Sequence, residues 1–319
     1  MSHISDWQSS IIGHRAQTDF LSRASEAKRL SSVYLFTGDR GVGKTAVARA
    51  FAAHLLSAAP EKLNSHSDFV TLEMEVNDKT GKEKESIGVD PVEIFRGRLE
   101  RSAFYGGKKI ALVENAGSLS VAAQNALLKT LEEPKGDTII FLVAERAEQL
   151  LPTVRSRAEE IRFGRVSDEA IYGALVSRGA PRREAGEITE HSAGCPGIAL
   201  ELSKDKIAFQ EYKNEMELAR KCIDPSYPHR LTAARNLLPV GDDHIKARKL
   251  LFRRLELLEG LIRGEMMKGV GIADKASDRE YPSRMSAVQA KTILSKMKTA
   301  RADIQNHIYP PLVLYQMIS

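Results

Sequence analysis

The sequence predicts an α/β fold with a mainly parallel sheet, followed by two helical modules. Short apolar runs alternate with helical patterns in the first half of the chain, as in sheets that helices cover on both faces. A helical block interrupted by glycine and proline follows residue 166, and the pattern is helical beyond residue 208. We therefore expect an α/β domain over 1–165, a small helical domain over 166–207 and an all-helical domain over 208–319.

The expected strands are apolar or β-branched runs without polar alternation, which suits strands buried on both faces: 33–36, 69–72, 110–113 and 139–143. Helical periodicity between these runs predicts helices over 45–59, 91–103 and 121–133. The segment 74–88 is charged and poor in large apolar residues, so we expect an exposed hairpin or loop there. Ser167 is expected to cap a helix, and residues 247–262 carry an apolar stripe.

The composition is that of a globular protein, with 319 residues, 42% hydrophobic and 28% charged. The longest wholly apolar run, 139–144, is far shorter than the roughly 20 residues that span a bilayer, so no membrane segment is expected. The N-terminus lacks a basic segment followed by an apolar one, which argues against a secretory signal. Two cysteines cannot build a four-cysteine zinc site, and a cytoplasmic location is the expectation.

Residues 38–45, Gly-Asp-Arg-Gly-Val-Gly-Lys-Thr, fit the phosphate-binding pattern G-x-x-x-x-G-K-[ST]. The string directly follows an expected strand and directly precedes an expected helix, which is the context that the pattern requires. Three glycines allow backbone N–H groups to turn toward phosphate oxygens at a helix N-terminus: Gly38, Gly41 and Gly43. Lys44 can supply positive charge to the phosphates, and the Thr45 hydroxyl can ligate Mg²⁺.

A P-loop ATPase also needs an acid at the end of a later strand to hold Mg²⁺, and a neighbouring carboxylate to activate water. Glu114 follows the strand expected at 110–113 and is the candidate for the metal and the nucleotide. Asn115 stands where the second carboxylate is needed, and an amide cannot take a proton from water at neutral pH. We therefore expect ATP and Mg²⁺ to bind with little or no hydrolysis by this chain alone.

Several segments resemble the AAA+ subunits of bacterial clamp loaders over nearly the whole chain. Residues 122–134, Ala-Ala-Gln-Asn-Ala-Leu-Leu-Lys-Thr-Leu-Glu-Glu-Pro, resemble the signature that follows the metal-binding strand of that family. Residues 156–158, Ser-Arg-Ala, resemble its Ser-Arg-Cys motif, with alanine in place of cysteine. Residues 11–14, Ile-Ile-Gly-His, resemble the box that lines the adenine pocket, which places Ile12 and Gly13 in the expected nucleotide site.

The resemblance implies an AAA+ domain, a lid domain and a C-terminal collar that joins subunits into a hetero-pentamer. It implies gamma/tau and delta subunits as partners, together with the sliding clamp and primed DNA. DNA contacts should be made to the phosphate backbone without base readout. The net charge of +5 has its basic excess in 208–319, which suits an acidic or polyanionic partner but equally suits solvated helix faces. No membrane partner is expected.

In that family, the arginine of the Ser-Arg motif reaches the ATP of the neighbouring subunit. The resemblance therefore assigns Arg157 as an arginine finger acting in trans, with Ser156 beside it. Both residues follow an expected exit from a strand into a loop at 150–154. The alternative is a structural arginine paired with a nearby acid such as Glu159.

Other positions depart from the motor subunits of the family. Motor subunits carry threonine after the strand expected at 139–143, where this chain has Glu145, and an arginine after a later glycine, where it has Ile198. Both departures favour a non-motor subunit, or stator, while a motor-type clamp-loader ATPase remains the alternative. Residues 46–113 contain no cysteine, so the zinc module carried by related subunits is missing and no zinc is expected.

Overall fold

The computed structural model describes residues 7–74, 76–77, 82–83, 86–105, 107–222 and 287–305, together with single positions between 232 and 262 and residue 313. The chain divides into two compact units, 1–204 and 205–319, and each is described by itself. The three-domain division expected from the sequence, with boundaries after residues 165 and 207, stays a prediction.

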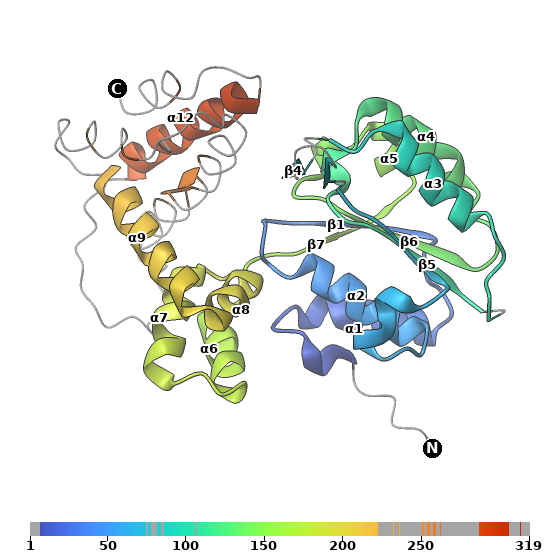
Figure 1. The fold of residues 1–319 in the computed structure, drawn as a ribbon, viewed down its shortest axis with the longest axis horizontal. Helices are drawn as coiled ribbons and strands as arrows, with labels where there is room; N and C mark the ends of the chain where they lie inside the picture. Colours follow the sequence, from blue (N-terminus) through green and yellow to red (C-terminus); the bar gives the residue numbers. More distant parts are fainter. Residues whose placement is uncertain are drawn as a thin grey trace. The chain divides into compact units, whose positions relative to one another are not determined.

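A five-stranded parallel sheet forms the centre of the first unit, in the order β2-β5-β6-β1-β7 (Figure 1). The three inner strands are buried along their whole length, because runs such as Thr-Ile-Ile-Phe-Leu-Val in β6 supply apolar side chains to both faces. The fold therefore contains the α/β sheet that the sequence predicts. The strands are β1 (Val33–Thr37), β2 (Phe69–Leu72), β5 (Lys109–Val113), β6 (Thr138–Val143) and β7 (Glu159–Arg162).

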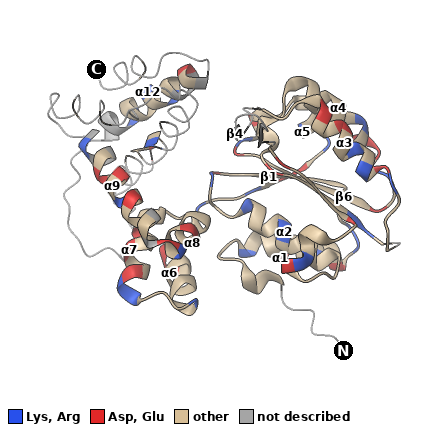
Figure 2. Ribbon diagram, viewed as in Figure 1, with Lys and Arg blue, Asp and Glu red and all other residues tan. Residues whose placement is uncertain are grey.

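Helices cover both faces of this sheet, with α1 and α2 on one face and α3, α4 and α5 on the other (Figure 1). One core packs Phe36, Phe51 and Phe141 between α2 and the sheet, and the other packs Leu127 of α4 with Leu142 on the opposite face. Both signs of charge occur on α3 and α4 (Figure 2). These helices are α1 (Arg15–Glu26), α2 (Lys44–Leu55), α3 (Val89–Leu99), α4 (Val121–Glu132) and α5 (Pro152–Arg155).

Three further helices complete the first unit: α6 (Asp168–Ser177), α7 (Arg182–Ser192) and α8 (Pro196–Lys204). Ser167 caps α6 as expected, since its side chain accepts a hydrogen bond from the Ala170 N–H. The 3-10 helices of the unit are Trp7–Ser10, Pro60–Ser65, Ala116–Ser118 and Ala147–Gln149. Within the hairpin expected at 74–88, β3 (Val76–Asn77) pairs antiparallel with β4 (Lys82–Glu83), and residues 75, 78–81 and 84–85 lie outside the described part.

The second unit contains α9 (Lys206–Cys222) and α12 (Ala287–Gln305) among its described residues. Three positions of the apolar stripe expected over 247–262 are described and buried, Leu251, Leu255 and Leu258, and Ile262 at the end of that range is buried as well. The other members of the stripe lie outside the described residues, as does most of the segment expected to form the collar. Over the part of the chain that the structure describes, no helix has the length and apolarity needed to cross a bilayer.

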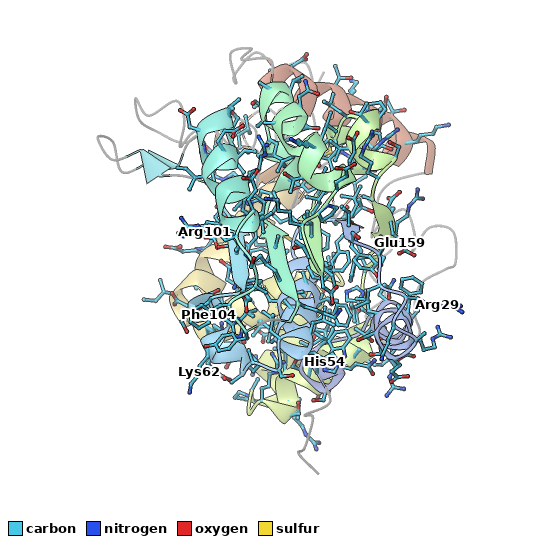
Figure 3. All side chains as sticks on the ribbon, turned by 90° about the vertical axis from the view of Figure 1, so that its right-hand side faces the viewer. Arg29, His54, Lys62, Arg101, Phe104 and Glu159 are labelled. Atoms are coloured by element: carbon cyan, nitrogen blue, oxygen red, sulfur yellow. The ribbon has the colours of Figure 1, made fainter. Side chains whose placement is uncertain are left out.

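All four expected strands are confirmed, but β7 was not expected. Its sequence, Glu-Glu-Ile-Arg, buries only Ile161, so it carries no apolar run. The strand forms because its backbone pairs in parallel with β1 at the edge of the sheet, where polar side chains reach solvent. Figure 3 shows Glu159 of β7 at one side of the sheet and Arg101 at the other.

Two helices end earlier than their periodicity predicts. The helix expected to reach residue 59 ends at Leu55, and Ser57 then adopts a left-handed conformation with φ 50°. The helix expected to reach residue 103 ends at Leu99, where the buried ammonium of Lys109 bonds to the carbonyl oxygens of Arg98 (3.0 Å) and Arg101. A cation placed on terminal carbonyls satisfies them and stabilises the end of a helix.

Phe141 provides a test of the core. It is fully buried on β6 and packs against Tyr34, Phe36 and Phe51 with ring centroids 5.5–6.1 Å apart. We expect Phe141→Ala to lower the free energy of unfolding by roughly 3–5 kcal/mol, because a cavity replaces the ring. Urea denaturation measures this loss, and Val121→Ala, at a position 61% exposed, is the control that should change little. Equal losses in both variants would contradict the core assignment.

Candidate functional site

The phosphate-binding loop joins the end of β1 to the start of α2, as the sequence predicts. Gly38, Gly41 and Gly43 all have positive φ angles, 145°, 80° and 110°, which side chains rarely tolerate. A Cβ on Gly38 would lie 2.2 Å from the carbonyl oxygen of Phe163, so only glycine fits there. The Gly38 N–H donates to the Glu145 carbonyl oxygen at 3.0 Å, which anchors the loop to the end of β6.

The Lys44 side chain points back into its own loop. Its Nζ donates to the carbonyl oxygens of Gly38 (2.6 Å) and Asp39 (2.8 Å), and the residue is buried. Burial lowers the pKa of Lys44 below its ordinary value, while the carboxylates of Glu145 and Asp39 oppose that shift. The ammonium thus lies where phosphate oxygens can replace two carbonyl oxygens as its partners, which fits a polyphosphate ligand.

The N-terminal end of α8 lies directly on this loop. The Gly197 N–H donates to the Gly41 carbonyl oxygen at 2.7 Å. A Cβ on Gly41 would lie 2.8 Å from Cγ1 of Ile198, so the two segments are in close van der Waals contact. Arg165 adds an ion pair with Asp39 at 3.4 Å and donates to the Ala193 carbonyl oxygen at 3.1 Å. Entry of a ligand over Gly41 therefore requires the start of α8 to move.

The segment that resembles the adenine box lies beside the same loop. His14 Nε2 is hydrogen-bonded to the Val42 carbonyl oxygen at 2.6 Å, and burial lowers the pKa of the imidazole. Gly13 has φ 74°, and a Cβ there would lie 2.6 Å from Cγ1 of Val166. Ile12 is buried next to it. The structure therefore brings the expected adenine and phosphate residues together through His14 and Val42.

Glu114 does not stand free for a metal ion. Its carboxylate pairs with the Arg49 guanidinium, with Nε 2.9 Å and Nη2 2.8 Å from Oε1. Arg49 also donates to Asn64 at 2.6 Å and pairs with Glu73 at 3.4 Å. Arg49 follows Thr45 by one helical turn, and that spacing is the signal that could have placed it on the Glu114 side of α2. A metal ion held by Thr45 and Glu114 would have to displace the guanidinium.

Thr45 and Glu114 are the two residues that the sequence predicts as Mg²⁺ ligands. No group of three or more His, Cys, Asp or Glu side chains in that part of the chain is arranged to hold a metal ion. The phosphate side of the site therefore fits its ligand better than the metal side does.

Arg157 follows a short helix, α5, where the sequence predicts the exit from a strand into a loop at 150–154. Pro152 occupies the first turn of α5, where its fixed φ and missing N–H are tolerated, and Val154 is buried beneath it. The guanidinium pairs with Glu132 through Nη2, and its Nη1 donates to the Thr153 carbonyl oxygen at 2.6 Å. The acid that pairs with Arg157 within the chain, as a structural arginine would need, is thus Glu132 of α4 and not Glu159.

The remaining guanidinium atoms of Arg157 are also constrained. Nη1 lies 3.3 Å from the Ser156 hydroxyl, so the two predicted residues of the motif are in contact. Nε is buried with no hydrogen-bond partner among the described residues. An unsatisfied buried donor costs about 1–3 kcal/mol, so this position of the side chain is held by its Nη contacts alone.

Two glutamines, which sequence reasoning missed, connect α4 to the segment before Arg157. Gln124 is buried and donates to the Leu119 (3.1 Å) and Gln149 (3.3 Å) carbonyl oxygens, while its Oε1 accepts from the Leu151 N–H at 2.7 Å. Gln149 Oε1 accepts the N–H groups of Glu145 (3.1 Å) and Arg146 (3.0 Å). The end of β6, α4 and α5 thus share one hydrogen-bonded network that reaches Glu145, the residue that anchors Gly38.

The depressed pKa of His14 predicts a pH dependence of stability. The unfolded chain protonates this imidazole near its ordinary pKa of about 6.5, whereas the folded chain does so only at lower pH. Stability from His14 is therefore present above pH 6.5 and is lost as the pH falls through the folded-state value. We expect the free energy of unfolding to drop between pH 7 and pH 5 less steeply in His14→Gln than in the wild type. Parallel urea titrations at the two pH values measure this, and equal slopes would contradict it.

Comparisons with known proteins show what the part of the chain that carries this site is similar to. Residues 13–167 match the family model described as DNA polymerase III, delta subunit. DNA polymerase III subunit delta' of Pseudomonas aeruginosa is 34% identical over 174 residues, which cover 49% of this chain and 48% of the relative. The Escherichia coli subunit delta' is 33% identical over 178 residues, which cover 51% of each chain.

A subunit with another name is also similar. DNA polymerase III subunit tau of Bacillus subtilis is 30% identical over 179 residues, which cover 52% of this chain and 30% of that relative. The chain spans about half the length of the delta' relatives that it matches. Residues 13–167 thus resemble the DNA polymerase III delta subunit family, and the chain is similar to delta' subunits over the same half of its length.

Proposed function

We propose that the chain is a delta'-like clamp-loader subunit of DNA polymerase III, which helps to load the sliding clamp onto primed DNA in the cytoplasm. The match of residues 13–167 to the family model and the similarity to delta' subunits support the class of protein. The observation that carries the finer proposal is a complete phosphate-binding loop beside an acid, Glu114, that Arg49 neutralises. Such a site suits a subunit that holds nucleotide without turning it over.

In this proposal, different residues of the loop bind the phosphates and the metal of Mg-ATP. Backbone N–H groups of the glycine loop and the Lys44 ammonium bind the phosphates, and Thr45 ligates Mg²⁺, which neutralises phosphate charge. Glu114 would hold the metal as well only if its carboxylate were no longer paired with Arg49. Asn115 cannot accept a proton from water, so no residue at the expected position acts as a base. The proposal is therefore nucleotide binding with negligible hydrolysis.

The catalytic contribution of the chain would then be made to a neighbour. Arg157 supplies its guanidinium in trans to ATP bound by a gamma/tau subunit of the hetero-pentamer, with delta as a further partner. A planar, permanently charged fork suits the charge that builds on a transferring phosphoryl group. Residues 208–319 join the collar, and primed DNA is held through its phosphates. Similarity to a tau subunit keeps a motor-type ATPase as the second candidate.

The first test is nucleotide binding by the isolated chain. We expect calorimetry to detect weak to moderate binding of Mg-ATP that Lys44→Ala removes, because the phosphates lose their ammonium. Lys62→Ala, an exposed lysine on the 3-10 helix Pro60–Ser65, is the matched control and should bind as the wild type does. Turnover of roughly 1 s⁻¹ or faster, abolished by Lys44→Ala, would establish the motor alternative instead.

The second test is Arg157→Ala in a complex reconstituted with its partner subunits. We expect folding and assembly to be kept while DNA-stimulated ATP hydrolysis and clamp loading fall. Arginine fingers contribute roughly 10³–10⁵ in rate in single-site NTPases, and the loss here should be smaller because other interfaces continue to work. Arg157→Lys should restore little, since an ammonium lacks the planar fork.

Arg155→Ala serves as the control, because Arg155 is an exposed arginine two residues away on the same segment. It should leave turnover unchanged. A structural role for Arg157 predicts the opposite pattern, with lost thermal stability or assembly and normal turnover in any complex that forms. Full turnover in a complete Arg157→Ala complex would remove the finger from the proposal.

A further inference from the structure

Glu132 binds the guanidinium that the proposed function sends to a neighbouring subunit. It is the last residue of α4, and its carboxylate accepts from Nη2 of Arg157. The Arg157 side chain is 32% exposed and that of Glu132 is 47% exposed, so the pair lies at the surface and can open without unfolding the core. The ion pair thus joins the proposed finger to its own chain at an accessible position.

This chain binds three of the five N–H donors of Arg157, and a fourth, on Nε, is buried. A guanidinium has five N–H groups, two on each Nη and one on Nε. Both donors of Nη1 are directed to the Thr153 carbonyl oxygen and the Ser156 hydroxyl. Nη2 is bonded to Glu132, and Nε is buried without a partner among the described residues. A two-bond grip on a phosphate therefore requires at least one of these contacts to open.

The position of Glu132 is not explained by the stability of α4. The C-terminal end of a helix carries partial negative charge, so a carboxylate in the last turn is electrostatically unfavourable there. Glu132 and the following Glu133 are both exposed acids at this end, and of these two described residues only Glu132 forms an ion pair with Arg157. This points to a role for Glu132 in binding Arg157.

We infer that Glu132 is a positioning residue that holds Arg157 in a retracted state until phosphate oxygens of a neighbouring nucleotide compete for the guanidinium. Carboxylate and phosphate bind a guanidinium in the same planar geometry, so one replaces the other. Release of the guanidinium breaks no hydrogen bond at Nε, because Nε has no partner to lose among the described residues. The inference rests on the proposed role of Arg157 and adds to it a residue that sets how readily the finger is released.

The experiment uses the full-length chain reconstituted with its partner subunits. Glu132→Gln keeps the shape of the side chain and removes its charge, so the retracted state weakens. We expect ATP turnover without primed DNA to rise roughly 1.5- to 5-fold, the range that one exposed ion pair can shift an equilibrium. Glu133→Gln removes an adjacent exposed acid and should leave turnover unchanged.

A double variant separates positioning from general stability. Glu132→Gln should have no effect on turnover in an Arg157→Ala background, because it acts through the guanidinium. A merely structural role would instead lower the melting temperature or assembly in both backgrounds. If Glu132→Gln does not assemble, Glu132→Asp, which shortens the reach by one methylene, replaces it with the same expected rise.

The outcomes also separate this inference from the proposed function. Unchanged or lowered turnover in an assembled Glu132→Gln complex, with Arg157→Ala still impaired, overturns the inference about Glu132 and leaves the finger in place. Full turnover in the Arg157→Ala complex overturns the finger itself, and the role of Glu132 with it.

Discussion

The pairing of β1 between β6 and β7 is the constraint on which the site depends. The register sets Phe36 opposite Val143 of β6 and Thr37 opposite Arg162 of β7, so the chain leaves the sheet at Gly38 between two fixed neighbours. Gly38 is then bonded to Glu145 on one side and closed by Phe163 on the other. The start of the loop is thereby set by backbone hydrogen bonds, and its shape follows from the glycines.

Three cations of the site share one property, because an acceptor of the same chain binds each of them. Lys44 bonds to loop carbonyls, Arg49 to Glu114, and Arg157 to Glu132. A ligand therefore exchanges partners with these groups and does not meet bare charges. Because exchange of one hydrogen bond for another gives a small net gain, binding energy depends on how well the ligand reproduces the contacts that it replaces. Specificity for phosphate geometry follows from the same exchange.

Local patterns in the sequence were sufficient for much of the fold and for the loop. The inner strands are continuous apolar runs, and Gly38 to Thr45 form one contiguous motif, so each could be identified without knowledge of distant residues. β7 could not be predicted in this way, because it forms by pairing with β1 and its own sequence, Glu-Glu-Ile-Arg, has no apolar run. Two ion pairs could not be predicted for the same reason, because each joins segments far apart in the sequence: Arg49 with Glu114, and Arg157 with Glu132.

The hydrogen bond between Gly197 and Gly41 couples ligand binding at the loop to the position of α8. A ligand that needs the space over Gly41 binds only the fraction of molecules in which α8 has moved away, so the measured affinity is the intrinsic affinity reduced by that fraction. Substitutions in α8 would then alter affinity without touching a phosphate. By the same linkage, a partner that gripped α8 in its open position would act as a distant activator of the loop.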